Sequence, residues 1–326
     1  MLNILNNNPL VINGGIMTNY NQTYLNGNGI SVAEADESNG TIELYEPTYS
    51  LISNISLDHK SLEELLELFT NFIKKTEKKC VLNADCKFSF GLINDENKDK
   101  VVTFGIENDL ADFNAYSIKL GAQSSGFSLK GVDFTINMAG IHNIYNALSA
   151  VAVLNINGYE LESIANALRS FKGIKRRMEF IGSFNEIDVI DDFAHNPDKI
   201  ANAINSVKPY CEGRLITIFQ PHGFAPTRLM KDGYIESFVS TLSKNDIVIM
   251  PEIYYAGGQV VRDISAKDLT SEIEKSGIKS YFFENRADIL AVLKEIAKPK
   301  DKIMVMGARD NSLNEFAKEI LEFMEN

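Results

Sequence analysis

Short apolar runs alternate with helical patterns throughout the second half of the chain. The runs fall at residues 187–191, 214–219, 246–250 and 302–306, and helices are expected near 197–207, 232–243, 266–275, 286–297 and 312–324. Strands of this length separated by helices predict a parallel sheet joined by right-handed crossovers. The second half is therefore expected to fold as a Rossmann-like α/β domain.

The first half predicts a second α/β domain with a less regular plan. Residues 62–73 place their apolar side chains on one helical stripe, and the Gly-rich breaks within 114–138 suggest a β-meander. Residues 1–5 resemble the end of a helix, further helices are expected at 141–154 and 161–171, and strands at 10–13, 29–35, 49–55, 80–82 and 101–104. A chain of 326 residues commonly holds two domains, and we place them at 1–177 and 178–326.

Composition excludes several classes of protein. The net charge of -12 argues against a non-specific binder of nucleic acid or of anionic membranes, although a local anion site remains compatible with it. Three cysteines without metal-type spacing fit a reducing cytoplasm. No run of 18 apolar residues predicts a transmembrane helix. We therefore expect a cytoplasmic protein whose ligands are small molecules.

The junction between the two expected domains carries a dense group of charged residues. A basic triplet, residues 175–177, precedes an apolar strand that ends in Asp191 and Asp192 and is followed by His195 and Pro197. Polar residues at the carboxyl end of a strand, before a proline that can open a helix, often form a site in α/β sheets. The same pattern also fits a capped strand-to-helix turn beside a solvated basic patch.

Acidic and imidazole side chains follow two strands of the first half. Glu34 and His59 would both project from the carboxyl edge of the sheet, where they could share a divalent cation. Mg²⁺ prefers one or two carboxylates, with water and phosphate completing its shell. The alternative is an acidic turn that caps the next segment.

Three further positions suit parts of a nucleotide. His142 and Asn143 open a helix and could hydrogen-bond a heterocycle, although Asn143 could equally be an ordinary residue of the first turn. Arg176 and Arg177 suit polyphosphate, because a guanidinium group meets phosphate oxygens with paired donors. Asp192 suits a ribose hydroxyl or a role beside a metal ion.

Six motifs occur in one order along nearly the whole chain, and together they resemble the Mur ligases. These are ATP-dependent amide-forming enzymes of peptidoglycan precursor synthesis, and the likeness is strongest to their alanine-adding branch. The motifs are Val-Ala-Glu-Ala-Asp-Glu-Ser (32–38), Ser-Asn-Ile-Ser-Leu-Asp-His (53–59), Gly-Ile-His-Asn-Ile-Tyr-Asn-Ala-Leu (140–148), Lys-Gly-Ile-Lys-Arg-Arg-Met-Glu (172–179), Asp-Asp-Phe-Ala-His-Asn-Pro (191–197) and Phe-Gln-Pro-His (219–222). The resemblance implies a central ATPase domain followed by a C-terminal Mur ligase domain.

The resemblance also implies a role for each matching residue. Glu34 and His59 would hold Mg²⁺, and Asp192 would face the ribose of ATP. Arg177, in preference to Arg176, would reach the phosphates, and His195 would face the γ-phosphate and the incoming amine. The adenine would lie along His142, Asn143 and Asn146. The implied reaction joins an amino acid or peptide to a UDP-N-acetylmuramate-type carboxylate through an acyl phosphate.

The chain departs from the family pattern at the phosphate loop. The family holds the ATP phosphates with a Gly-rich loop that ends in Gly-Lys-Ser or Gly-Lys-Thr, and residues 1–326 contain no Gly-Lys dipeptide. Residues 1–15 look like the helix tail and strand that follow this loop, so the central domain is expected to be incomplete. Differences at 219–227 and 251–258 leave the amino substrate open.

Two hypotheses follow for the activity of this chain. In the first, it is the greater part of a Mur-type ligase that is inactive alone and works when a longer product or a partner chain supplies the missing part. In the second, it is a non-catalytic homologue that retains weak binding of a nucleotide or a partner. Both hypotheses require the same fold.

Overall fold

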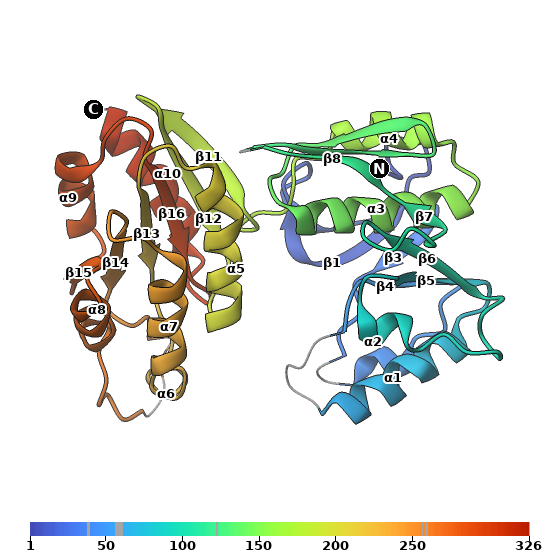
Figure 1. Cartoon of the computed structure of the whole chain (residues 1–326), viewed down its shortest axis with the longest axis horizontal. Helices are drawn as coiled ribbons and strands as arrows, with labels where there is room; N and C mark the ends of the chain where they lie inside the picture. The colour runs from blue at the N-terminus through green and yellow to red at the C-terminus, as the bar shows by residue number, and fades with distance from the viewer. Residues whose placement is uncertain (38–39, 56–60, 122, 256, 258–259, 326) are drawn as a thin grey trace. The chain divides into compact units, whose positions relative to one another are not determined.

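The computed structural model describes residues 1–37, 40–55, 61–121, 123–255, 257 and 260–325 (Figure 1). Two compact units make up the chain, Met1–Lys172 and Gly173–Asn326. The last residue of the first unit is fixed by its own unit, because the Lys172 N–H donates to Asn19 Oδ1 at 2.8 Å. Arg176 is fixed in the second unit, since its N–H donates to Glu179 Oε2 at 2.8 Å. Residues 173–175 therefore form a very short connection.

The second unit is built on one six-stranded sheet of order β11-β12-β16-β13-β14-β15. β11 runs antiparallel to β12, and every other pair of neighbours is parallel. The strands are β11 (Glu179–Phe184), β12 (Ile187–Asp192), β13 (Leu215–Phe219), β14 (Ile247–Pro251), β15 (Lys279–Phe283) and β16 (Lys302–Met306), and the α-helices are α5 (Pro197–Val207), α6 (Phe224–Leu229), α7 (Lys231–Thr241), α8 (Ala266–Lys275), α9 (Asp288–Ile296) and α10 (Ser312–Glu325), with a 3-10 turn η2 (Lys208–Tyr210) after α5.

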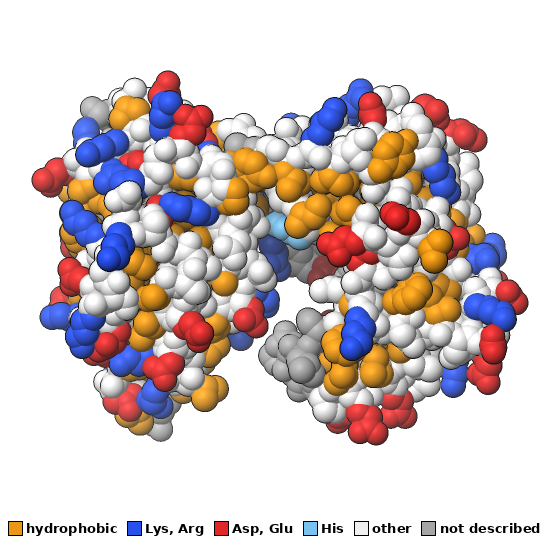
Figure 2. Space-filling model, viewed as in Figure 1, with side chains coloured by type: hydrophobic (Ala, Val, Ile, Leu, Met, Phe, Trp, Pro, Cys, Tyr) orange, Lys and Arg blue, Asp and Glu red, His pale blue; other side chains and the backbone are white. Residues whose placement is uncertain are grey.

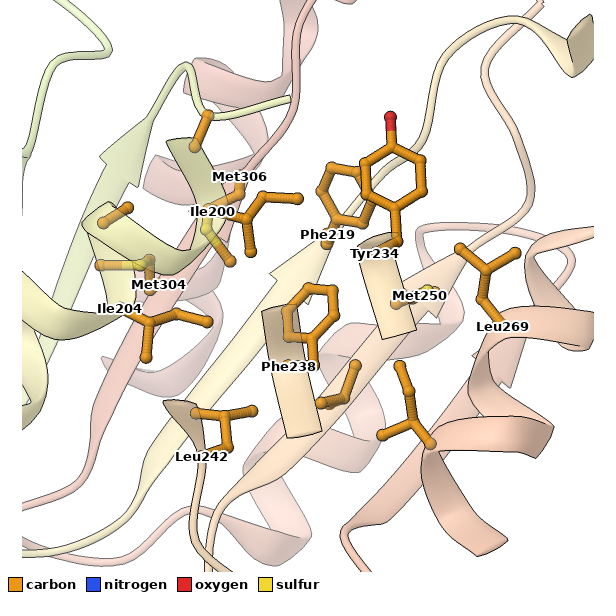
Figure 3. Close-up of a cluster of buried hydrophobic side chains, with 14 of the residues drawn as sticks. Ile200, Ile204, Phe219, Tyr234, Phe238, Leu242, Met250, Leu269, Met304 and Met306 are labelled. Carbon is orange, nitrogen blue, oxygen red and sulfur yellow. The ribbon is translucent and has the colours of Figure 1, made fainter. Parts of the chain in front are cut away.

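Helices cover both faces of this sheet, because its central strands are apolar on both sides. Alternate residues of one strand enter different cores: Ile190 packs with α5, α7 and α8, whereas Val189 packs with α9 and α10. Figure 3 shows the first of these cores, where Phe219 of β13 faces Tyr234 and Phe238 of α7. The parallel sheet expected from the sequence is confirmed.

Local sequence signals set the starts of the helices that follow these strands. Asn196 accepts the Lys199 N–H through its side chain, and Pro197 occupies the first turn of α5. Ser265 and Asp268 form a reciprocal capping box at the start of α8. Each cap places the preceding loop at the carboxyl edge of the sheet.

The first unit contains three separate sheets rather than one. A parallel sheet has the order β4-β5-β6-β7, a mixed sheet the order β2-β1-β3, and an antiparallel meander the order β10-β9-β8. The strands are β1 (Leu10–Met17), β2 (Gln22–Leu25), β3 (Ser31–Ala33), β4 (Tyr49–Ile52), β5 (Lys79–Asn83), β6 (Val101–Gly105), β7 (Phe113–Asn114), β8 (Tyr116–Leu120), β9 (Ser125–Leu129) and β10 (Val132–Ile136), and the helices are η1 (Thr41–Leu44), α1 (Leu62–Lys75), α2 (Lys87–Phe90), α3 (Ile141–Ile156) and α4 (Leu161–Arg169).

Two helices cover the parallel sheet of the first unit. α1 packs through Leu65, Phe69 and Ile73 against the face that carries Leu82, whereas α3 packs against the face that carries Val81. The parallel strands β4 to β7 thus form a sheet separate from that of β1 and β3. β3 and β4 are the end strands of their respective sheets.

The N-terminal residues differ from the expectation of a helix end. Residues 1–7 form hydrogen-bonded turns, in which the Leu5 N–H donates to Met1 O and the Asn7 N–H donates to Leu2 O. Asn6 and Asn8 adopt positive φ angles of 59° and 53°, which Asn tolerates better than most residues. These two asparagines stop the turns from extending into a helix.

Charged side chains are dispersed on the visible surface. Figure 2 shows acidic and basic groups interspersed over this face of each unit, without a continuous basic area.

Candidate functional site

Loops from neighbouring strands meet at the carboxyl edge of the six-stranded sheet in the second unit. Those after β12, β13 and β16 bring together Asp192, His195, His222 and Arg309. Ligands of open α/β sheets bind at this edge, because the connections there diverge and leave backbone and side-chain groups exposed. This edge is the part of the second unit that can hold a ligand.

A buried ion pair lies directly beneath the edge. Arg176 is 7% exposed, and its Nε lies 3.3 Å from an oxygen of the fully buried Asp191. Burial raises the pKa of Asp191 to about 6, although Arg176 and Asn314 oppose this rise. The remaining donors of Arg176 bind the carbonyl oxygens of Gly307 at 2.6 Å and Asp310 at 3.1 Å.

Asp192 is fixed by two backbone donors. Its Oδ2 accepts the Met178 N–H and its Oδ1 accepts the Ala194 N–H, each at 2.8 Å. The carboxylate is therefore oriented before any ligand arrives. An oriented acceptor at a strand end suits a ribose hydroxyl, so the sequence-based role of Asp192 fits this position and stays a prediction.

The core of the second unit holds His195 in place. The buried Tyr234 of α7 donates its hydroxyl to the His195 carbonyl oxygen at 2.8 Å (Figure 3 draws this Tyr234 side chain). His195 Nδ1 lies 2.8 Å from Phe193 O. A carbonyl oxygen only accepts, so the neutral ring carries its proton on Nδ1 and its lone pair on Nε2. Burial lowers the pKa of His195, and Lys199 and Arg177 act in the same direction.

His222 lies beside His195 and completes an imidazole pair. The two ring centroids are 5.6 Å apart in an edge-on arrangement. Burial, together with the charges of His195 and Arg309, lowers the pKa of His222. Its Nδ1 is buried and has no hydrogen-bond partner within the described part of the chain. Both imidazoles are therefore neutral at pH 7 and lie in a basic environment.

The basic triplet is divided between two environments. Arg177 is exposed, and its guanidinium lies 5.3 Å from the centroid of the Phe193 ring. Arg176 lies 5.0 Å from the same ring but is buried, with its donors occupied inside the second unit. The alternative of a wholly solvated basic patch is wrong for Arg176. This arrangement supports the preference for Arg177 at the phosphates, and both phosphate roles stay predictions.

The first unit presents a separate candidate surface at the start of α3. His142 and Asn146 are exposed and lie one turn apart on the same side of the helix, where both could line a heterocycle. Asn143 is instead buried, and its amide donates to Ala139 O at 2.8 Å. The adenine roles of these three residues stay predictions.

Of the two predicted metal ligands, Glu34 and His59, the structure describes only Glu34. The exposed Glu34 accepts the Gly14 N–H on Oε2 at 2.7 Å, which orients the carboxylate. His59 lies outside the described residues. No cluster of three or more His, Cys, Asp or Glu side chains that could hold a metal occurs in the described ranges. One oriented carboxylate fits Mg²⁺, which takes its other ligands from water and phosphate.

Sequence reasoning missed a group of residues at the carboxyl edge. Arg286 donates to Gln220 Oε1 at 3.1 Å, to Asp310 Oδ2 at 2.6 Å and to the Ser312 hydroxyl at 2.6 Å. Gln220 in turn donates to Glu252 O at 3.1 Å. The available signal was the position of Gln220 and Asp310 just after apolar strands, as for Asp192.

Sequence comparisons bear directly on both units. The profile of the Mur ligase middle domain matches residues 22–154, and that of the Mur ligase glutamate ligase domain matches residues 176–309. A UDP-N-acetylmuramate–L-alanine ligase of Rickettsia bellii is 32% identical over 96% of this chain and 69% of its own length. The chain belongs to the Mur ligase family.

Other Mur ligases extend this relationship. The UDP-N-acetylmuramate–L-alanine ligase of Dictyoglomus turgidum is 33% identical over 94% of this chain and 68% of its own length. A crystal structure of the corresponding ligase from Thermotoga maritima superposes with a TM-score of 0.77 at 24% identity, over 99% of this chain and 70% of that one. A murein peptide ligase of Psychrobacter arcticus gives a TM-score of 0.62 at 22% identity, over 100% of this chain and 73% of that one. These structures confirm the Mur ligase fold.

Among the described residues, no helix is long and apolar enough to span a bilayer.

Proposed function

We propose that this chain supplies the greater part of an ATP-dependent ligase that joins an amino acid or peptide to a UDP-N-acetylmuramate-type carboxylate. The observation that carries this proposal is the relationship to alanine-adding ligases along 94–96% of the chain, at 32–33% identity. The oriented Asp192 and the His195–His222 pair at a sheet edge are the groups such a reaction would use.

Residues in each unit have an expected role toward ATP. His142 and Asn146 would line the adenine, with the buried Asn143 holding the start of α3 between them, and Asp192 would accept a ribose hydroxyl. Arg177 would meet phosphate oxygens with paired donors, with Arg176 fixing the loop beneath it. Glu34 and His59 would hold Mg²⁺, which would neutralise charge on the phosphates and on the reacting carboxylate.

The chemical step would be formation and aminolysis of an acyl phosphate. The substrate carboxylate attacks the γ-phosphorus of ATP and ADP leaves, after which an amine attacks the acyl carbon and phosphate leaves. His195 suits the second step, because its neutral Nε2 lone pair can accept a proton from the incoming amine. Arg177 would stabilise the charge that develops during phosphoryl transfer.

Residues 1–326 alone would turn over ATP slowly or not at all. The reason is the lack of a Gly-Lys-Ser/Thr loop within them, because that loop supplies backbone N–H donors and a lysine to the phosphates. A polypeptide carrying this loop, either in the same product or in a partner chain, would restore the reaction.

The test is phosphate release by the purified chain with ATP, Mg²⁺, UDP-N-acetylmuramate and individual amino acids. We expect no release above a no-enzyme control, and release on addition of a Mur ligase fragment that contains the phosphate loop. Asp192→Asn is the matched variant, because it keeps the shape of the side chain but should abolish the restored activity. Turnover by the chain alone would refute the proposed inactivity.

A non-catalytic role is the alternative, and one comparison separates the two. If the added fragment fails to restore turnover while ATP still binds with an affinity that falls in His142→Ala, the chain is a nucleotide-binding homologue rather than a ligase component. If neither turnover nor binding is found, both assignments fail.

A further inference from the structure

Residues 1–33 form an uncharged segment of the first unit. They contain no Asp, Glu, Lys, Arg or His, whereas 23% of the residues of the whole chain are charged. Ile12 and Tyr24 are cross-strand neighbours in β1 and β2, so they lie together on one face of this sheet. Exposed apolar groups that lie together mark an interaction surface. The large apolar side chains of this segment that are exposed are Ile4, Ile12, Ile16, Tyr24, Ile30 and Val32.

The end strand of this segment, β3, lacks the features that protect the edges of sheets. Proteins guard end strands against pairing with other chains by placing charged side chains or proline in them. Lys119 in β8, Glu179 in β11 and Lys279 in β15 are such charges in other end strands. In β3 every residue is exposed, and none is charged or proline. Within the described part of the chain β3 pairs with β1 alone, so its other edge is open to a further strand.

The hydrogen bonds between β1 and β3 show which backbone groups of β3 point to this open edge. The Leu10 N–H donates to Ile30 O at 3.2 Å, and the Glu34 N–H donates to Ile12 O at 2.9 Å. The backbone groups of successive residues in a strand point to opposite sides, so the even-numbered residues of this stretch face β1. The odd-numbered residues of β3 therefore direct their N–H and C=O groups away from β1.

The outward groups of β3 are arranged symmetrically about Val32. They belong to Ser31 and Ala33, which lie on either side of Val32. In an antiparallel pair, two residues that lie opposite each other exchange both of their backbone hydrogen bonds. Ser31 of one copy can therefore pair with Ala33 of another copy, and Ala33 with Ser31, around a two-fold axis at Val32. The edge of β3 is thus complementary to itself.

We infer that β3 pairs with β3 of a second copy of this chain, antiparallel and in register about Val32. The two sheets of order β2-β1-β3 then become one continuous sheet across the two-fold axis. Val32 meets its own counterpart there as a non-hydrogen-bonded pair, the arrangement that brings opposite side chains closest. The inference is independent of the proposed ligase function, because it rests only on the edge of β3.

The distribution of charge favours a second copy as the occupant of this edge. Each copy has a net charge of -12, so two copies repel each other wherever their charged surfaces meet. Residues 1–33 bring no charge to the contact. The first charged residue is Glu34, and in the inferred register it lies opposite Ile30 rather than opposite its own counterpart. Its carboxylate is held on its own sheet by the Gly14 N–H at 2.7 Å.

The experiment measures self-association of the intact chain by sedimentation velocity over a wide range of protein concentration. A junction between two short strands is small, and interfaces that bury less than about 1,200 Å² are weak and transient. We therefore expect a reversible equilibrium between monomer and dimer with a dissociation constant of about 10–100 µM. Neither ATP nor a second polypeptide is present in this measurement.

Val32→Lys and Val32→Glu are the decisive variants, because each places two like charges at the two-fold axis. Val32 is 43% exposed, so either charge is hydrated in the monomer and the fold should be retained. We expect each variant alone to raise the dissociation constant at least about tenfold, since like charges that lie directly opposite are destabilising. An equimolar mixture of the two variants should associate about as tightly as the unmodified chain, because opposite charges then meet at the axis.

Two further variants separate the edge of β3 from other surfaces. Ala33→Pro removes an outward N–H without touching the hydrogen bonds to β1, and it should also weaken the dimer at least about tenfold. Leu51→Lys is the matched control, because Leu51 lies in the uncharged end strand β4 and is 39% exposed. It should associate as the unmodified chain does.

Each result either supports or overturns the inference. Weakened association of both single variants at Val32, restored by mixing them, supports the two-fold contact at β3. A chain that stays monomeric at every concentration overturns it, as does a dimer that Val32→Lys and Ala33→Pro leave unchanged. A mixture of the two Val32 variants that stays monomeric overturns the register, and a dimer lost in Leu51→Lys assigns the contact to β4 instead.

Discussion

Replacing Arg176 by methionine tests the energetic role of the buried ion pair beneath the candidate site. The substitution keeps the length of the side chain but leaves Asp191, which is 0% exposed, without its cation. Breaking a buried pair in this way costs about 3–5 kcal/mol, because the remaining charge is neither solvated nor compensated. The carbonyl oxygens of Gly307 and Asp310 also lose a donor. We therefore expect a loss of about 3 kcal/mol in the unfolding free energy of the second unit at pH 7.

The loss should depend on pH in a defined direction. The pKa of Asp191 is raised from its ordinary value of 3.8 to about 6, so its contribution to stability is full below pH 3.8 and is lost as the pH rises through 6. At about 1.4 kcal/mol per pKa unit, the buried carboxylate already costs the unmodified chain about 3 kcal/mol at neutral pH. Without Arg176 this pKa rises further. At pH 5 the protonated Asp191 needs no cation, so the deficit of the variant should shrink to about 1–2 kcal/mol.

The assay is native-state hydrogen exchange of the full chain in urea, read from the amides of β12 and β16, which report the second unit alone. Arg228→Met is the matched control, because Arg228 pairs with Asp263 at the surface, where the two side chains are 45% and 50% exposed. An exposed pair contributes about 0–1 kcal/mol, so this control should change little at either pH. A deficit of Arg176→Met that is below about 1 kcal/mol at pH 7, or equal at pH 5 and pH 7, would refute the reasoning.

Two further substitutions probe polar groups that fix the frame of each unit. Tyr145→Phe removes a hydroxyl that donates to Asp85 at 2.7 Å, whereas three backbone N–H groups still bind that carboxylate. We therefore expect the unfolding free energy of the first unit to fall by only about 1 kcal/mol, measured by hydrogen exchange of the β5 and β6 amides. No change would show that this hydrogen bond is redundant. Asp246→Asn should cost the second unit about 2–4 kcal/mol at pH 7, because Lys208, Ser243 and the Leu215 N–H all bind the buried carboxylate. Burial alone would raise the pKa of Asp246, but these donors hold its pKa below the ordinary value of 3.8. The ionised Asp246 therefore stabilises the second unit above pH 3.8, and this stabilisation is lost on acidification. Urea unfolding at pH 3 and pH 7 should show the loss in the unmodified chain and not in Asp246→Asn.

Hydrophobic periodicity predicted the elements that are buried on both faces. The apolar runs at 187–191 and 302–306 correspond to β12 and β16, two interior strands of the sheet, and the cap at Asn196 and Pro197 sets the first turn of α5. The two edge strands were missed for a physical reason. β11 contains Gly182 and β15 begins with Lys-Ser, so neither gives a continuous apolar run. α6 was missed because Pro226, which suggests a break, is accommodated in its first turn.

The candidate site was predictable where it depends on strand ends and not where it depends on tertiary packing. Asp192, His195 and His222 lie at or just after the ends of apolar strands, so their meeting at one edge follows from a parallel sheet. The burial of Arg176 could not be read from the triplet, because it depends on carbonyl groups more than 130 residues away. Arg309 gave no local signal either, since its left-handed conformation, with a φ angle of 67°, is recognised only from the backbone.

The three-residue connection between the units marks a natural point for dividing the gene. Lys172 is hydrogen-bonded within the first unit and Arg176 within the second, so a break or an insertion at residues 173–175 would leave the interior of each half unchanged. The halves could then be encoded and produced as separate polypeptides, with Arg176 kept at the start of the second. Such a split would let the two units be varied and recombined independently, as exchangeable modules of one protein family.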